Sequence, residues 1–195
     1  MPLLFIIAGP PGIGKSSSGK IFQPFNIDFL NHDALSLYYK EKGEYNYEDL
    51  SNLKANEFIQ KKLNGNEDFG IELNLGYENH YDLLRFVKEK YPHYDITVCL
   101  FYTDDIQLCL DRATIRERSG GHSVSEQVIR EMYANTLHLL QNNVSLITNL
   151  IFVDIQYDML DLVFEFNPKE NRLFISSHLP DWLIINFPAI IQLRK

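Results

Sequence analysis

Blocks of apolar and polar residues follow one another along this chain, and their spacing predicts strands and helices in turn. Residues 3–8 and 96–102 are almost continuously apolar, which is typical of strands buried on both faces of a sheet. Shorter strands are expected at 25–29 and 69–73, and two late candidates, which form either a hairpin or separate sheet strands, lie at 162–167 and 172–176.

The stretches between these strands carry apolar residues at helical spacing. Leu50, Phe58 and Leu63, for example, fall on one stripe of a helix. Helices are expected at about 15–22, from Asn31 onward, and at 47–63, 79–90, 105–117 and 123–141. Strands that alternate with helices indicate an α/β fold whose sheet is mostly parallel, with right-handed crossovers.

A glycine-rich loop follows the first strand and carries the most specific motif of the chain. Residues 9–16, GPPGIGKS, match the pattern G-x-x-x-x-G-K-S of a phosphate-binding loop. In such loops backbone N–H groups hold phosphates, the lysine reaches the β- and γ-phosphates, and the serine ligates Mg²⁺. The sequence therefore predicts ATP binding, with Ser16 as the Mg²⁺ ligand. The expected contacts are Gly9, Pro10, Pro11, Gly12, Ile13, Gly14, Lys15, Ser16 and Ser17.

Length and composition limit the architecture and the partners. The 195 residues suit one P-loop NTPase/kinase-like domain with three layers, 1–195. A net charge of −8 disfavours nucleic acid as a partner, because polyphosphate attracts basic surfaces. Cys99 and Cys109 are expected to be buried free thiols, in keeping with a cytoplasmic location. No basic segment of a signal peptide precedes the first strand, and the late apolar stretch 182–193 is too short to span a membrane.

Polar candidates stand at the ends of two further predicted strands. In open α/β sheets ligands bind outside the carboxyl ends of the strands, where Asn31, Asp33, Glu72 and Asn74 are expected. Asp33 is suited to deprotonate an acceptor hydroxyl or to help hold Mg²⁺, but a helix cap or first-turn acid is an equally good interpretation. Glu72 also has two interpretations, because it is either a site residue or an acid at a solvated strand end.

An arginine-rich segment forms the last candidate. Arg112 and Arg116 are four residues apart and share a helix face, with Arg118 near the helix end. Such arginines supply permanently charged planar donors to phosphoryl groups, and the following glycines would let residues 112–135 close as a lid. The alternative is a solvated helix end. His122 is either a substrate contact or an ordinary loop histidine.

Together these motifs resemble the zeta-toxin family of P-loop kinases, over about residues 3–167. Asn31 and Asp33 match the N-x-D motif of that family. Its F-x-x-E-x-x-L strand is matched by Phe69, Glu72 and Leu75. Its R-x-x-x-R-x-R-x-G-G-H lid is matched by Arg112, Arg116, Arg118, Gly120, Gly121 and His122.

The resemblance implies a kinase that uses ATP and Mg²⁺ to phosphorylate a hydroxyl group of a small molecule; characterised toxins of the family act on UDP-N-acetylglucosamine. By this resemblance Lys15, Asp33, Arg116 and Arg118 are the catalytic residues, with Asp33 as the base, and Arg112 contacts the nucleotide. The residues expected to bind the acceptor are Asn31, Glu72, Asn74, His122 and Arg130. The resemblance also allows an antitoxin protein as a partner.

The sequence departs from the family pattern at three positions. Ser125 and Met132 stand where the family often has a proline and an arginine, and Asn74 stands where a threonine is common. Arg130 is the nearest arginine to Met132. A second function therefore stays open, that of an ATP-binding switch or interaction protein with lost or weak kinase activity. A kinase that acts on nucleic-acid ends is a third reading, which the acidic composition disfavours. The appendage 168–195 carries no family motif.

Overall fold

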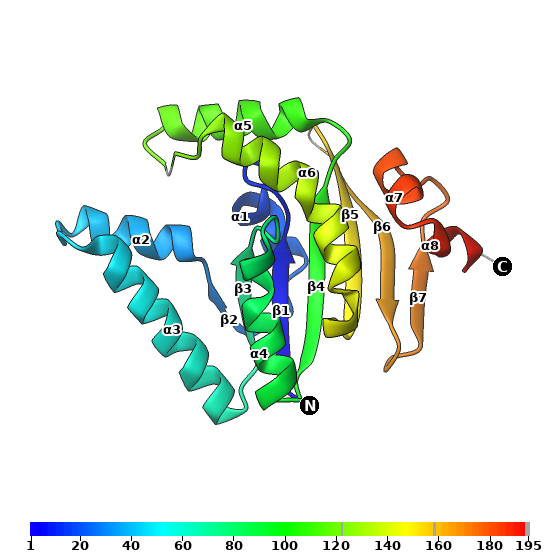
Figure 1. Ribbon diagram of the computed structural model, residues 1–195, viewed down its shortest axis with the longest axis horizontal. Helices are drawn as coiled ribbons and strands as arrows, with labels where there is room; N and C mark the ends of the chain where they lie inside the picture. The colour runs from blue at the N-terminus through cyan, green and yellow to red at the C-terminus, as the bar shows by residue number, and fades with distance from the viewer. Residues whose placement is uncertain (122, 158, 194–195) are drawn as a thin grey trace.

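One sheet of seven strands organises the part of the chain that the structure describes, and helices pack on both of its faces (Figure 1). The computed structural model describes residues 1–121, 123–157 and 159–193. The strand order is β2-β3-β1-β4-β5-β6-β7, in which the first five strands are parallel and the last two are antiparallel. The strands are β1 (Leu3–Ala8), β2 (Asp28–Leu30), β3 (Phe69–Leu73), β4 (Asp95–Tyr102), β5 (Asn149–Gln156), β6 (Met159–Asn167) and β7 (Arg172–Ile175). The expected α/β class with a mostly parallel sheet is confirmed.

Three of the described α-helices begin at a side-chain cap. Asn31, Asp105 and Ser125 each accept a hydrogen bond from a backbone N–H in the first turn of the helix that follows. The α-helices are α1 (Lys15–Ser18), α2 (His32–Glu41), α3 (Tyr47–Gly65), α4 (Asp82–Lys90), α5 (Ile106–Arg118), α6 (Glu126–Asn142), α7 (Asp181–Asn186) and α8 (Pro188–Gln192). Short 3₁₀ helices cover Gly19–Ile21, Glu78–Tyr81 and Val144–Leu146.

Four elements differ from the sequence-based expectation. The expected strand 25–29 is replaced by β2, which starts later because Asn26 adopts a left-handed conformation with a φ of 63°. The expected helix 15–22 is divided into α1 and a 3₁₀ turn at Gly19. The strand β5 was not expected at all. The late hairpin is confirmed as β6 and β7, although β6 begins at Met159 rather than near 162.

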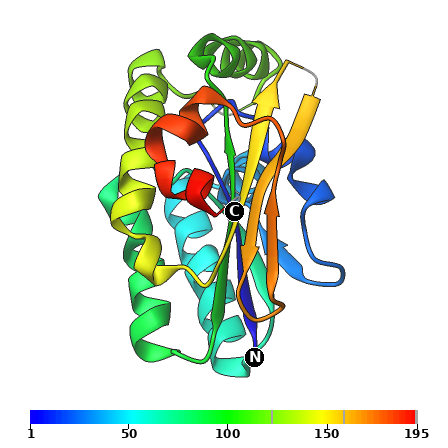
Figure 2. The ribbon, with the colours of Figure 1, turned by 90° about the vertical axis from the view of Figure 1, so that its right-hand side faces the viewer.

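Alternate residues of the central strand supply two separate cores. On β1, Leu4, Ile6 and Ala8 join the larger core, which is covered by α3, α4, α6, α7 and α8. Phe5 and Ile7 point to the other face and join a smaller core with α5. Figure 2 shows this division, with the blue segment after β1 on one side of the sheet and the green and yellow-green helices α4 and α6 on the other. The continuous apolar run of β1 thus reflects burial on both faces.

The C-terminal segment packs against the larger core. Trp182, Leu183 and Ile190 are buried there, and the Trp182 indole Nε1 donates a 2.7 Å hydrogen bond to Oδ1 of the buried Asp154 on β5. No described helix combines the length and apolarity that crossing a bilayer requires. Both cysteines are buried and free, as expected.

Candidate active site

The phosphate-binding loop joins β1 to α1 at the carboxyl edge of the parallel strands. Gly9 and Gly12 have positive φ angles of 139° and 82°. A Cβ on Gly9 would overlap the carbonyl oxygen of Phe101, and one on Gly12 would overlap that of Cys109. Larger residues would therefore push the loop away from β4 and α5, which hold it in place.

The Lys15 ammonium lies inside this loop. Its Nζ donates hydrogen bonds to the carbonyl oxygens of Gly9 at 2.7 Å and Pro10 at 3.1 Å, and to Asn74 Oδ1 at 2.8 Å. Burial lowers the pKa of Lys15 to about 8, although the nearby carboxylates of Glu72 and Asp33 oppose the shift. The lysine is therefore a cation at neutral pH, and it is held by neutral oxygen acceptors.

Three strand ends meet around Ser16. The Ser16 hydroxyl donates a 2.8 Å hydrogen bond to Glu72 Oε2 at the end of β3. Asn31 Nδ2 donates a 3.1 Å hydrogen bond to the same hydroxyl oxygen, while Asn31 Oδ1 accepts one of 2.9 Å from the backbone N–H of Ala34. Asn31 thus caps α2 and contacts the phosphate-loop helix at the same time.

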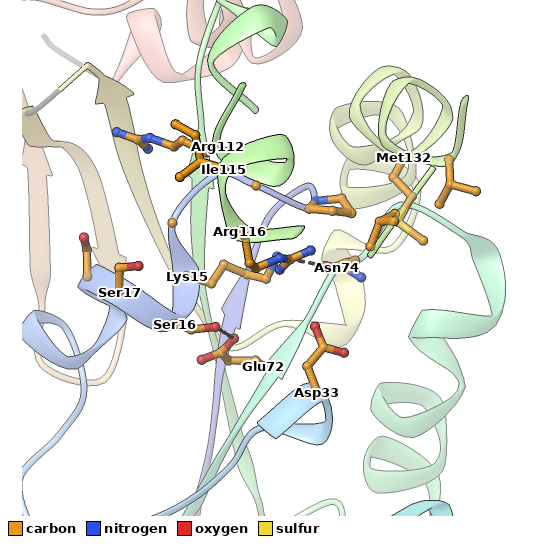
Figure 3. Close-up of a pocket in the computed structure, with 16 residues that line it drawn as sticks. Lys15, Ser16, Ser17, Asp33, Glu72, Asn74, Arg112, Ile115, Arg116 and Met132 are labelled. Carbon is orange, nitrogen blue, oxygen red and sulfur yellow. Dashed lines mark hydrogen bonds between the residues drawn. The ribbon is translucent and has the colours of Figure 1, made fainter. Parts of the chain in front are cut away.

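Asp33 lies in the first turn of α2, and its carboxylate points toward the side chains of Lys15 and Arg116 (Figure 3). The capping position belongs to Asn31, so Asp33 is the first-turn acid of the helix. Asp33 also lines the same cavity as Lys15. The structure therefore combines the two interpretations that the sequence left open, since a first-turn acid can also face a site.

Two arginines of α5 approach the loop from the opposite side. Arg112 donates to the Ile13 carbonyl oxygen at 3.1 Å and also to the carbonyl oxygen of Tyr157. Arg116 is different, because its Nε and Nη2 atoms are buried and have no hydrogen-bond partner among the described residues. Gly121 packs directly on the Arg116 stem, where a Cβ would come within 2.7 Å of Cγ.

A cavity of about 570 Å³ brings these groups together. Figure 3 shows Lys15 and Arg116 side by side above Asp33, with Glu72 beside Ser16. The wall opposite the loop is apolar and consists of Val124, Val128 and Met132. Val124 and Val128 are not among the site residues expected from the sequence. Their spacing of four residues, continued by Met132, is the signal that could have found this wall.

Two of the predicted arginines do not reach this cavity. Arg118 and Arg130 are exposed and do not line it. Arg130 pairs instead with Glu126 on its own helix, with 2.6 Å between Nη2 and Oε1. Met132 takes the position toward the cavity. His122 lies outside the described residues.

The residues around the cavity fit an anion and a divalent cation. The unpaired Arg116 donors and the buried Lys15 cation call for negative oxygens, because unpaired buried donors are costly. The Ser16 hydroxyl beside Glu72 offers the hard oxygen ligands that Mg²⁺ prefers. Among the described residues there is no group of three or more His, Cys, Asp or Glu side chains that could hold a metal by itself.

Comparison with solved structures shows which known proteins share this fold. The sequence matches no protein-family model and no curated protein. The structure resembles a chain from the PezAT chromosomal toxin–antitoxin system of the human pathogen Streptococcus pneumoniae, with a TM-score of 0.64 and 15% identity over 99% of this chain and 84% of that one. This chain has a zeta-toxin-like P-loop kinase fold.

Other solved structures share parts of the zeta-toxin-like fold. A chain of the AvrRxo1-ORF1:AvrRxo1-ORF2 structure with sulphate ions has a TM-score of 0.61 at 14% identity, over 91% of this chain and 61% of that one. A putative kinase from Chloroflexus aurantiacus has a TM-score of 0.53 at 14% identity, over 69% of this chain and 78% of that one. Identities this low establish the fold alone.

Proposed function

We propose that this protein is a kinase that transfers the γ-phosphoryl group of ATP to a hydroxyl group of a small molecule. The observation that carries this proposal is the cavity shared by Lys15, Asp33 and Arg116, in which two Arg116 donors have no partner among the described residues. The kinase-like fold supports the proposal. The acceptor class we favour is a nucleotide sugar such as UDP-N-acetylglucosamine, on the family resemblance of the motifs.

The polar residues in and beside the cavity have distinct roles in this proposal. The glycine-rich loop, Lys15 and Arg112 would bind the nucleotide, and Ser16 would ligate Mg²⁺ with Glu72 and Asn31 fixing its hydroxyl. When bound, MgATP would supply the phosphoryl group. Asp33 would accept the proton of the acceptor hydroxyl. Arg116 would direct its free N–H donors toward negative oxygens, in an environment where such contacts are strong.

The test is transfer of labelled γ-phosphate to a nucleotide-sugar panel headed by UDP-N-acetylglucosamine. Asp33→Asn should leave the Kd for ATP within about threefold and lower the transfer rate about 10²- to 10⁴-fold. Asp49→Asn is the matched control, because Asp49 is also a first-turn helix acid but does not line the cavity. Normal turnover by Asp33→Asn would show that Asp33 is not the catalytic base.

A second candidate is an ATP-binding switch without phosphoryl transfer. It is favoured by Met132, which lines the cavity at a position where the resemblance leads one to expect an arginine. Tight ATP binding with no labelled product from the panel or from a metabolite extract would support the switch. A labelled metabolite would exclude it.

We also propose a protein partner that regulates the site, as an antitoxin would. This rests on similarity to a chain of a structure described as a toxin–antitoxin system, and to a chain of a two-protein AvrRxo1 structure. The partner should co-purify with the full chain from the cytoplasm of the native cells and should lower ATP binding or transfer when added back.

A further inference from the structure

The wall of the active-site cavity opposite the phosphate-binding loop is formed by three apolar side chains, Val124, Val128 and Met132. Val128 and Met132 are one turn apart on α6, and Val124 lies just before that helix. Both valines keep part of their surface exposed. A phosphate group gains nothing from such a surface, because apolar side chains cannot replace the hydration of an anion. The wall is therefore suited to an uncharged part of a ligand.

The loop that follows β3 holds this wall in position. Gly76 packs directly on Met132, where a Cβ on the glycine would come within 2.6 Å of the methionine Cβ. The hydroxyl of the next residue, Tyr77, donates a 3.0 Å hydrogen bond to Oε2 of Glu131 on α6. The wall is thus already formed in the free protein, as the surfaces of small-molecule sites usually are.

The wall lies on the side of the cavity where the acceptor is expected. Figure 3 shows Arg112 on one side of Lys15, and Asp33 and Met132 on the other. In the proposed phosphoryl transfer, on which this inference rests, Lys15 binds the phosphates and Asp33 receives the proton of the acceptor hydroxyl. The acceptor consequently occupies the space that Asp33 shares with the apolar wall.

The cations of the described cavity lining are already assigned to other partners. Arg112 donates to two backbone carbonyl oxygens, one of them in the phosphate-binding loop. Lys15 lies inside that loop, and Arg116 lies beside Lys15, where the transferred phosphoryl group would bind (Figure 3). Asp33 itself repels a second carboxylate. An acidic group on the acceptor would therefore find no countercharge next to the wall.

We propose that this wall selects acceptors whose hydroxyl-bearing unit is uncharged and has one apolar face, such as the ring of a neutral sugar. One hydroxyl group of the ring points toward Asp33, while its C–H groups pack on Val128 and Met132. A carboxylate on the same ring would lose hydration without gaining a partner. The wall is thus a specificity determinant that excludes sugar acids.

The test is calorimetric titration of the full chain, loaded with Mg²⁺ and a non-hydrolysable ATP analogue, with UDP-glucose and UDP-glucuronate. These two probes differ only at C6 of the sugar, which carries a hydroxyl group in one and is a carboxylate in the other. We expect the Kd of UDP-glucuronate to be about tenfold higher or more. Equal affinities, or no binding of either probe, would overturn the proposal.

Two substitutions that add the same charge identify the wall as the cause. Val128→Lys provides a cation at the wall and should lower the ratio of the two Kd values, UDP-glucuronate over UDP-glucose, about tenfold. Gln127→Lys is the matched control, because Gln127 is the exposed neighbour and does not line the cavity. It should change the ratio less than twofold. Equal ratios in the two variants would contradict the role of the wall.

A third substitution keeps the shape of the wall and adds no charge. Val128→Thr replaces one methyl group by a hydroxyl group of similar size, and should raise the Kd of UDP-glucose about threefold. This variant also tests the proposal if Val128→Lys does not fold. An unchanged Kd would show that the sugar does not pack on Val128.

Transfer of labelled γ-phosphate to the same two sugars separates this inference from the proposed function. Selective binding of UDP-glucose without any labelled product would support the role of the wall and contradict the kinase. Labelled UDP-glucuronate formed as fast as labelled UDP-glucose would support the kinase and overturn the selectivity.

Discussion

The Lys15 ammonium donates a 2.8 Å hydrogen bond to Asn74 Oδ1, and this contact ties the phosphate-binding loop to the end of β3. Two carbonyl oxygens of the loop itself, from Gly9 and Pro10, complete its set of acceptors. A phosphate that enters the loop must compete with these three oxygens for the same cation. Replacing these oxygens by a phosphate is favourable only while Lys15 is protonated, since a neutral amine attracts an anion only weakly.

ATP binding should therefore weaken as the pH rises above the pKa of Lys15. Burial lowers this pKa to about 8 in the free protein, and a bound phosphate would raise it again. Above pH 8 the complex then holds more protons than the free protein, so binding takes up a proton and the Kd increases, by at most about tenfold per pH unit. Calorimetric titration between pH 7 and pH 9.5 measures this. Lys15→Met should bind weakly with no such slope, and a flat wild-type profile would contradict the assignment.

Replacement of Arg116 should separate catalysis from stability. Arg116→Met should lower phosphoryl transfer about 10²-fold or more, because it removes donors to the transferring group. The free energy of unfolding should stay equal or rise, since two buried donors without described partners are removed. Arg118→Met is the control, because Arg118 is exposed two residues further along the same helix. A loss of transfer confined to Arg118→Met would assign the catalytic role to that residue instead.

Loss of the Glu72 charge should be visible as a changed need for Mg²⁺. Glu72→Gln still accepts the hydrogen bond of the Ser16 hydroxyl but no longer supplies a negative charge beside it. We expect the Mg²⁺ concentration for half-maximal transfer to rise about tenfold or more. Glu57→Gln removes an exposed carboxylate from α3 and should not shift the Mg²⁺ curve. Identical curves for both variants would show that Glu72 does not act on the metal.

The hydrogen bond between Trp182 and Asp154 should contribute measurably to stability. Trp182→Phe removes the Nε1 donor from the buried Asp154 carboxyl group. Among the described residues, the side-chain donor that remains is Gln156 Nε2, at 2.8 Å. Hydrogen bonds to charged groups are worth about 1.5–3 kcal/mol, and we expect a loss of that size in the free energy of unfolding. Urea denaturation followed by circular dichroism measures it. Ile185→Ala, at a position 74% exposed in the same helix, should cost less than about 0.5 kcal/mol.

The sequence was sufficient to predict how the strand ends meet. The phosphate loop, Asp33 and Glu72 were each assigned to the carboxyl edge of a parallel sheet, and the structure brings them into one cavity. The spacing of four between Arg112 and Arg116 correctly predicted a shared helix face. The same rule places Arg118 about 200° around the helix from Arg116, and it separates Arg130 from Met132 in the same way. Helical periodicity could therefore have indicated that Arg118 and Arg130 do not line this cavity.

The strand β5 could not be recognised from local pattern. Asn149 and Asp154 interrupt its apolar run, yet both are buried, at 8% and 4% exposure. Their burial depends on partners distant in the chain, since Thr97 accepts from the Asn149 amide and Trp182 donates to Asp154. Contacts of this kind are a property of the tertiary structure and leave no signal in the spacing of neighbouring residues.

Trp182 is the one tryptophan in the sequence, and it lies 3% exposed against the rings of Tyr102 and Phe152. The C-terminal appendage thus carries the dominant intrinsic fluorophore of the protein on a surface that exists only when the appendage is packed. The emission spectrum is consequently an optical signal of that packing, and it needs no label.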